Sequence, residues 1–141
     1  MACNRCFKTM MRNKEFPCGL PNLKPIPARK VEFGNAMADV SVHLAVAQLR
    51  AHGQWTWEQP LTSIMWDYPA VKAFMAEHQI ARPVSHICCY GAPWVKPTAV
   101  ATSMPELLGL NCRCPGGHDH IALQGSAPCG TNWTNRQSLL A

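Results

Sequence analysis

The sequence predicts an α/β fold in which an amphipathic helix precedes a small set of strands joined by helical crossovers, the last strand running antiparallel. Three observations support this prediction. Residues 29–52 contain no proline and repeat apolar side chains at helical spacing. Three β-prone runs follow, each bounded by glycine or proline. The last two of these runs are separated by a loop of about six residues, the length of a hairpin connection.

The first helix is predicted over residues 29–52. Its apolar side chains recur at intervals of three and four, and we expect this stripe to face the core: Phe33, Met37, Val40, Leu44 and Ala47, widened by Ala36, Val46 and Leu49. Gly53 follows as a stop signal. Four prolines lie before this helix, at positions 17, 21, 25 and 27. Because closely spaced prolines interrupt helices and central strands, residues 1–28 are predicted to form an irregular arm.

The remaining elements follow in order. A strand is predicted over residues 54–58 and is closed by Pro60, and a second helix runs from Pro69 to about His78. Strands are then predicted over residues 84–90 and 97–102. Because parallel strands need a crossover, we expect the first two strands to be parallel and the last to be antiparallel. Residues 29–110 then form the α/β half domain, and residues 111–141 form a Cys/His-containing loop and tail.

Composition limits the function classes. With 141 residues and 48% hydrophobic side chains, the chain is expected to fold as one domain rather than remain disordered. A net charge of +5 suits DNA or another acidic partner, although it also serves solubility alone. Without an apolar run of spanning length or a signal peptide, an intracellular protein with no membrane partner is expected, in cytoplasm or nucleus. The eight cysteines are then expected to be reduced thiols or metal ligands.

Several short stretches occur in an order that carries a family resemblance. They are Gly19-Leu20-Pro21-Asn22-Leu23, Val31-Glu32-Phe33-Gly34-Asn35-Ala36, the run from Trp57 to Trp66, Cys89-Tyr90-Gly91, Lys96-Pro97-Thr98, Cys114, His118-x-His120 and Leu123-x-Gly125. Over about residues 16–125 the chain resembles the C-terminal part of divergent cytosine-5 DNA methyltransferase-like proteins of phages and mobile elements. The resemblance implies a partial class I methyltransferase-like (Rossmann-like) sheet and S-adenosylmethionine as cofactor.

The resemblance also assigns roles to single residues. Glu58-Gln59-Pro60 stands where the family has Glu-Asn-Pro, so Glu58 would hydrogen-bond the cytosine ring and relieve its charge after thiolate attack. Gln59 departs from the motif, which puts the fine geometry in doubt. Lys96 and Thr98 would contact the DNA backbone. Without the resemblance, Glu58 is an exposed residue at the end of an edge strand, and Lys96 is a solvated loop lysine.

Cys3 is the counterpart of the family nucleophile, but Ala2 replaces the proline of the Pro-Cys motif. The strand before that motif and the glycine-rich loop for S-adenosylmethionine have no counterpart in the sequence, so Cys3 lacks the scaffold that lowers a thiol pKa. We therefore expect a truncated protein that is inactive alone. A second chain supplying the missing half would be its partner.

A Cys/His cluster forms a separate signal near the C-terminus. Two thiols and two imidazoles lie within nine positions: Cys112, Cys114, His118 and His120. These are preferred zinc ligands, and Pro115-Gly116-Gly117 supplies a tight turn between the pairs. Cys129 could replace one ligand, and the Cys3/Cys6 pair could join. The competing interpretation is a polar loop whose histidines face water.

Three tryptophans lie in or after the first predicted strand. Trp55, Trp57 and Trp66 could form a base-stacking surface, but we predict that they belong to the core.

The sequence thus predicts a truncated cytosine-5 DNA methyltransferase-like protein. The alternative is a small zinc-stabilised module that binds nucleic acid or protein without catalysis, and a gene remnant without function is a third hypothesis.

Overall fold

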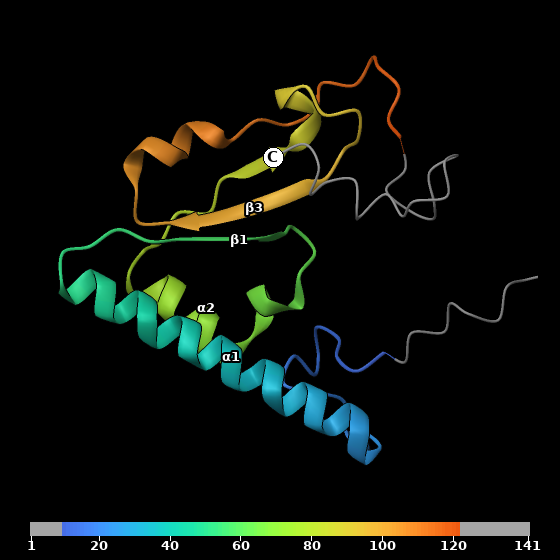
Figure 1. Ribbon diagram of the computed structural model, residues 1–141, viewed down its shortest axis with the longest axis vertical. Coiled ribbons are helices and arrows are strands. Elements are labelled where there is room, and N and C mark those ends of the chain that lie inside the picture. The colour runs from blue at the N-terminus through green and yellow to red at the C-terminus, as the bar shows by residue number, and fades with distance from the viewer. Residues whose placement is uncertain (1–9, 122–141) are drawn as a thin grey trace, which may run out of the picture.

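A computed structural model describes residues 10–121, in which helices pack against a small sheet (Figure 1). Its helices are α1 (Pro25–Arg50) and α2 (Pro69–Glu77), and its strands are β1 (Thr56–Pro60), β2 (Val84–His86) and β3 (Pro97–Thr102). Three short 3-10 helices complete it: η1 (Ile64–Asp67), η2 (Ile87–Tyr90) and η3 (Pro105–Leu110). Mixed helix and sheet is the class that the sequence predicts.

The helix α1 begins four residues earlier than the sequence predicts. Pro25 occupies the first helical position, and the first backbone bond runs from the Ala28 amide to the Lys24 carbonyl. The first turn of a helix leaves its amides without intrahelical partners, so prolines at positions 25 and 27 cost no hydrogen bond there. The predicted irregular arm therefore ends at Lys24.

Only part of the apolar surface expected of α1 packs against the core. The centre of the predicted stripe lies in solvent, with Phe33 71% and Leu44 62% exposed. Two predicted members, Val46 and Leu49, do pack against the core, together with Ala38, Val42 and Ala45, which the prediction missed. The packed face of α1 is thus shifted toward one side of the predicted stripe.

The sheet has the strand order β1-β3-β2. The central strand β3 is antiparallel to both neighbours, with Glu58 opposite Val100 and Ser85 opposite Thr98. Strands β1 and β2 consequently run in the same direction, as predicted, but β3 separates them and they do not pair. The β2–β3 connection, residues 87–96, contains η2 and is longer than the loop of about six residues that the sequence predicts.

The predicted strand over residues 84–90 is too long. Strand β2 ends at His86, and the chain turns through η2 because the Gly91 amide donates to the Cys88 carbonyl at 3.1 Å. Gly91 has a φ of 88°, a left-handed conformation that glycine adopts without strain. This turn redirects Cys88 and Cys89 away from the sheet.

Aromatic side chains form the core between α2 and the sheet. The rings of Trp55 and Trp57 lie 5.3 and 5.5 Å from that of Phe74, and both are tilted against it. Trp55 and Trp66 are buried, and Trp57 packs against the buried cluster. The prediction that these tryptophans are core is confirmed. None of the helices among residues 10–121 has the length and hydropathy needed to cross a membrane.

Candidate metal centre

Four metal-ligating side chains converge at the end of the sheet. Cys88 comes from η2, and Cys114, His118 and His120 come from the segment that follows η3. One ligand atom from each residue lies within 4.8 Å of all the others. The two thiols are half-buried and the two imidazoles are exposed.

The distances inside this group match a tetrahedral site. The Sγ atom of Cys114 lies 3.7 Å from Nε2 of His118 and 3.5 Å from Nε2 of His120. With zinc bonds of about 2.3 Å to sulfur and about 2.05 Å to nitrogen, tetrahedral geometry separates the two ligand atoms by about 3.6 Å. The residues present therefore fit a zinc ion in donor type and number, and the two Cys114–histidine distances fit its geometry.

Hydrogen bonds hold the Cys114 segment against the free edge of β2. The His86 amide donates to the Cys112 carbonyl at 2.8 Å, and the Cys114 amide donates to Nδ1 of His86 at 3.2 Å. The Ser85 hydroxyl also donates to the Leu110 carbonyl. These bonds bring Cys114 beside η2, although the two segments are far apart in the sequence.

A glycine turn returns the histidines toward Cys114. Gly116 and Gly117 have φ angles of 78° and 79°, which other residues adopt only with strain. The Gly116 amide donates to the Cys114 Sγ at 3.3 Å, a contact that orients a thiolate ligand. Beyond the histidines, the Ile121 amide donates to the Pro93 carbonyl at 2.7 Å. The turn expected at Pro115-Gly116-Gly117 is thus present and is tied down at both ends.

The ligand set differs from the sequence-based one in one member. Cys114, His118 and His120 are in the group, but Cys88 takes the place predicted for Cys112. The short turn η2 aims Cys88 at Cys114, and Cys112 instead contacts Cys89. Local spacing in the sequence could not find Cys88, because its approach depends on the pairing of β2 with the later segment. Cys129, Cys3 and Cys6 lie outside the described residues.

Both thiols of η2, Cys88 in this group and Cys89 beside it, have raised pKa values. Burial raises the pKa of Cys88, and hydrogen bonding to Cys114 adds to the rise. Hydrogen bonding to Cys112 raises the pKa of Cys89 to about 12, with burial the next cause. A metal ion that binds Cys88 therefore has to displace a proton, as thiolate ligation requires.

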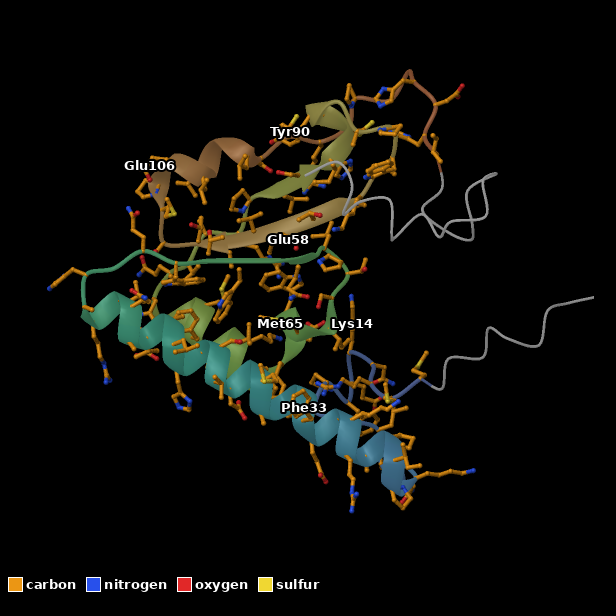
Figure 2. All side chains as sticks on the ribbon, in the orientation of Figure 1. Lys14, Phe33, Glu58, Met65, Tyr90 and Glu106 are labelled. Atoms are coloured by element: carbon orange, nitrogen blue, oxygen red, sulfur yellow. The ribbon has the colours of Figure 1, made fainter. Side chains whose placement is uncertain are left out.

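A second site lies on the sheet face opposite the helices. Glu58 and Thr98 line a cleft of about 400 Å³, whose other walls are mostly apolar: Ile87, Tyr90, Val100 and Leu110. Glu58 and Tyr90 are labelled in Figure 2. The Nζ atom of Lys96 lies 3.8 Å from Oε1 of Glu58, and both side chains are partly exposed. The fold thus brings the predicted residues Glu58, Lys96 and Thr98 together.

Thr98 has a different position from the one its predicted role requires. It is 2% exposed, and its hydroxyl donates to the Lys96 carbonyl at 3.2 Å. A side chain that is buried and internally bonded is poorly placed for a DNA phosphate, whereas Lys96 and Glu58 have exposed surface. Cys3, the predicted nucleophile, lies outside the described residues. No protein-family model, curated protein or solved structure matches this chain.

Proposed function

We propose that this protein is a small zinc-stabilised module that binds nucleic acid without catalysis. One observation carries the proposal, namely the convergence of Cys88, Cys114, His118 and His120 within 4.8 Å. Four protein ligands would fill a tetrahedral zinc ion completely. Such a closed site leaves no position for a reacting water or substrate, so its role is structural.

Zinc at this position would join two segments that are distant in the sequence. Cys88 lies in η2, directly after β2, and the other three ligands lie on a segment without helix or strand. That segment has few apolar contacts, since Pro115 to Ile121 are all exposed. Metal ligation supplies the folding free energy that burial does not, on the order of 10 kcal/mol in zinc-finger peptides.

Metal analysis of the full chain, purified without a histidine tag, tests the zinc site. We expect one equivalent of zinc, lost in Cys114→Ser and retained in Cys18→Ser, whose thiol is exposed and outside the group. Zinc well below one equivalent and unchanged by Cys114→Ser would contradict the proposal.

The proposal that this protein binds nucleic acid is based on its net charge. The net charge is +5, and phosphate contacts make such binding fall steeply with salt concentration. Polarisation of a labelled oligonucleotide, measured at several salt concentrations, should show this dependence. Oligonucleotide binding that is absent at low salt would contradict this part while leaving the zinc site intact.

The second candidate function is that of a cytosine-5 DNA methyltransferase-like protein. The pairing of Lys96 with Glu58, which lines the cleft, favours it, because a carboxylate for the base and a cation for the DNA backbone would then be adjacent. Under this proposal the sheet is the distal part of a class I methyltransferase-like (Rossmann-like) sheet. The antiparallel last strand β3 and the α2 crossover between β1 and β2 support that assignment.

The cofactor of that reaction does not fit the described residues. S-adenosylmethionine in the resembled family is held by a glycine-rich loop, and within residues 10–121 no strand is followed directly by such a loop. Under this proposal a second chain supplies the loop. Incubation with cytosine-containing duplex DNA and labelled S-adenosylmethionine is expected to give no transfer by this chain alone. Transfer that disappears in Glu58→Gln would instead assign catalysis to the chain itself.

A further inference from the structure

Three cationic side chains line one cleft that is separate from the metal centre. Lys14, Lys72 and Arg82 surround a space of about 470 Å³, within the range of small-ligand pockets. The same cleft contains the polar side chains of Thr62, Ser63 and Asp67. Asp67 is its single carboxylate, so the side chains lining it carry more positive than negative charge.

The fold brings these cations from three distant segments. Lys14 belongs to the stretch before α1, which the Arg12 guanidinium ties to α1 by donating to the Val31 carbonyl at 2.7 Å. Figure 2 shows Lys14 beside the turn that carries Met65. Lys72 lies in the first turns of α2, and Arg82 lies just before β2.

Arg82 is oriented by an aromatic ring. Its guanidinium carbon lies 4.8 Å from the centroid of the Trp66 ring, a cation–π distance. Trp66 is itself buried, and its indole nitrogen donates to the Pro60 carbonyl at 3.0 Å. A fixed ring beneath the guanidinium reduces the entropy lost when Arg82 binds a ligand, because the guanidinium is already held.

The cations form no ion pairs within the described residues. None of the three forms an ion pair with any carboxylate of residues 10–121, where the pairs are Lys96–Glu58 and His78–Glu77. Like charges that share a cleft repel one another, and a bound anion removes that repulsion. Arginine and lysine with neighbouring hydroxyls are the donors that bind phosphate oxygens in proteins.

We infer that the cleft of Lys14, Lys72 and Arg82 binds a phosphate group. The ligand is either a free phosphate or phosphate monoester, or one phosphate of a nucleic-acid backbone. The inference requires no metal ion and does not depend on the zinc site.

The experiment is a chemical-shift titration of the full-length chain with sodium phosphate, against sodium chloride at constant ionic strength. We expect saturating shifts at the amides of Thr62, Ser63 and Lys72. Affinity should fall by about tenfold or more in the double variant Lys72→Gln/Arg82→Gln, because two charge-assisted contacts are lost. Lys30→Gln is the control, since Lys30 is exposed on α1 and does not line the cleft.

A second arm separates the two sources of phosphate. An oligonucleotide without a terminal phosphate is titrated into the same variants. Binding that requires Lys72 and Arg82 assigns the cleft to a nucleic-acid backbone, and binding of inorganic phosphate alone assigns it to a small ligand. The inference is overturned if neither probe gives saturating shifts there, or if the double variant binds both as well as Lys30→Gln does. Thermal unfolding of each variant shows whether it is folded.

Discussion

Cys88 and Cys114 lie on different segments of the chain, yet their Sγ atoms are within 4.8 Å of each other and of two histidine nitrogens. The edge of β2 makes this approach possible, because it hydrogen-bonds to the segment that carries Cys114. The metal centre therefore depends on tertiary pairing and not on one local motif.

The thiols of Cys88 and Cys112 distinguish the ligand set in the structure from the one that sequence spacing suggests. Cys88→Ser is expected to lower zinc binding well below one equivalent, whereas Cys112→Ser should retain it, because Cys112 contacts Cys89 and lies outside the group. Both variants replace sulfur by oxygen and so change the side-chain volume equally. Metal analysis after dialysis measures the difference. Loss of zinc in Cys112→Ser with retention in Cys88→Ser would favour the sequence-based set.

A hydrogen bond between α1 and Tyr68, the residue before α2, should make stability depend on pH. The Tyr68 hydroxyl donates to both carboxylate oxygens of Asp39, at 3.0 and 3.1 Å. Burial, followed by this hydrogen bond, raises the pKa of Tyr68 above its usual value of 10.0. The folded state thus holds the phenolic proton more tightly than the unfolded chain. Its contribution is complete below pH 10 and is lost as the pH rises through the folded-state pKa.

Tyr68→Phe tests this relationship. The variant should lose about 1 kcal/mol of unfolding free energy at neutral pH, since Asp39 loses a hydrogen-bond donor. It should also lose part of the decline in stability above pH 10 that the parent protein shows. Urea denaturation at pH 7 and at several values above 10 measures both effects. An identical decline in parent and variant would mean that other groups cause it.

Two substitutions compare the exposed face of α1 with the aromatic core between α2 and the sheet. Leu44→Gln should change the unfolding free energy by less than about 0.5 kcal/mol, because Leu44 is 62% exposed. Phe74→Ala should cost about 3–5 kcal/mol, since Phe74 is 3% exposed and contacts Trp55 and Trp57. Denaturant unfolding of both variants gives the comparison. A large loss in Leu44→Gln would show that the predicted stripe is covered in solution.

The ion pair between Lys96 and Glu58 is expected to contribute little to folding. Lys96 and Glu58 are 3.8 Å apart and partly exposed, and such pairs contribute about 0–1 kcal/mol. Glu58→Gln should therefore fold with nearly the stability of the parent chain. Any loss of oligonucleotide binding in this variant can then be attributed to the cleft. A loss of more than about 2 kcal/mol in urea unfolding would instead make Glu58 a structural residue.

The sequence by itself determined the elements whose limits are set by local chemistry. Proline and glycine punctuation marks β3 at 97–102 and the start of α2 at Pro69, and both predictions match the structure within a residue. The density of cysteine and histidine after position 111 also identified three of the four grouped ligands. These features depend on the dihedral limits and donor chemistry of neighbouring residues, which the sequence states directly.

Tertiary structure alone decided which partners those elements meet. The period of α1 allows a wide apolar surface, and core packing covers only the part that includes Ala38, Val42 and Ala45. The fourth metal ligand and the cationic cleft likewise join segments that are distant along the chain. Helical periodicity and ligand spacing describe a side chain relative to its neighbours in sequence. Strand pairing and core packing set the distances between segments, so contacts such as that of Cys88 with Cys114 arise only in the folded chain.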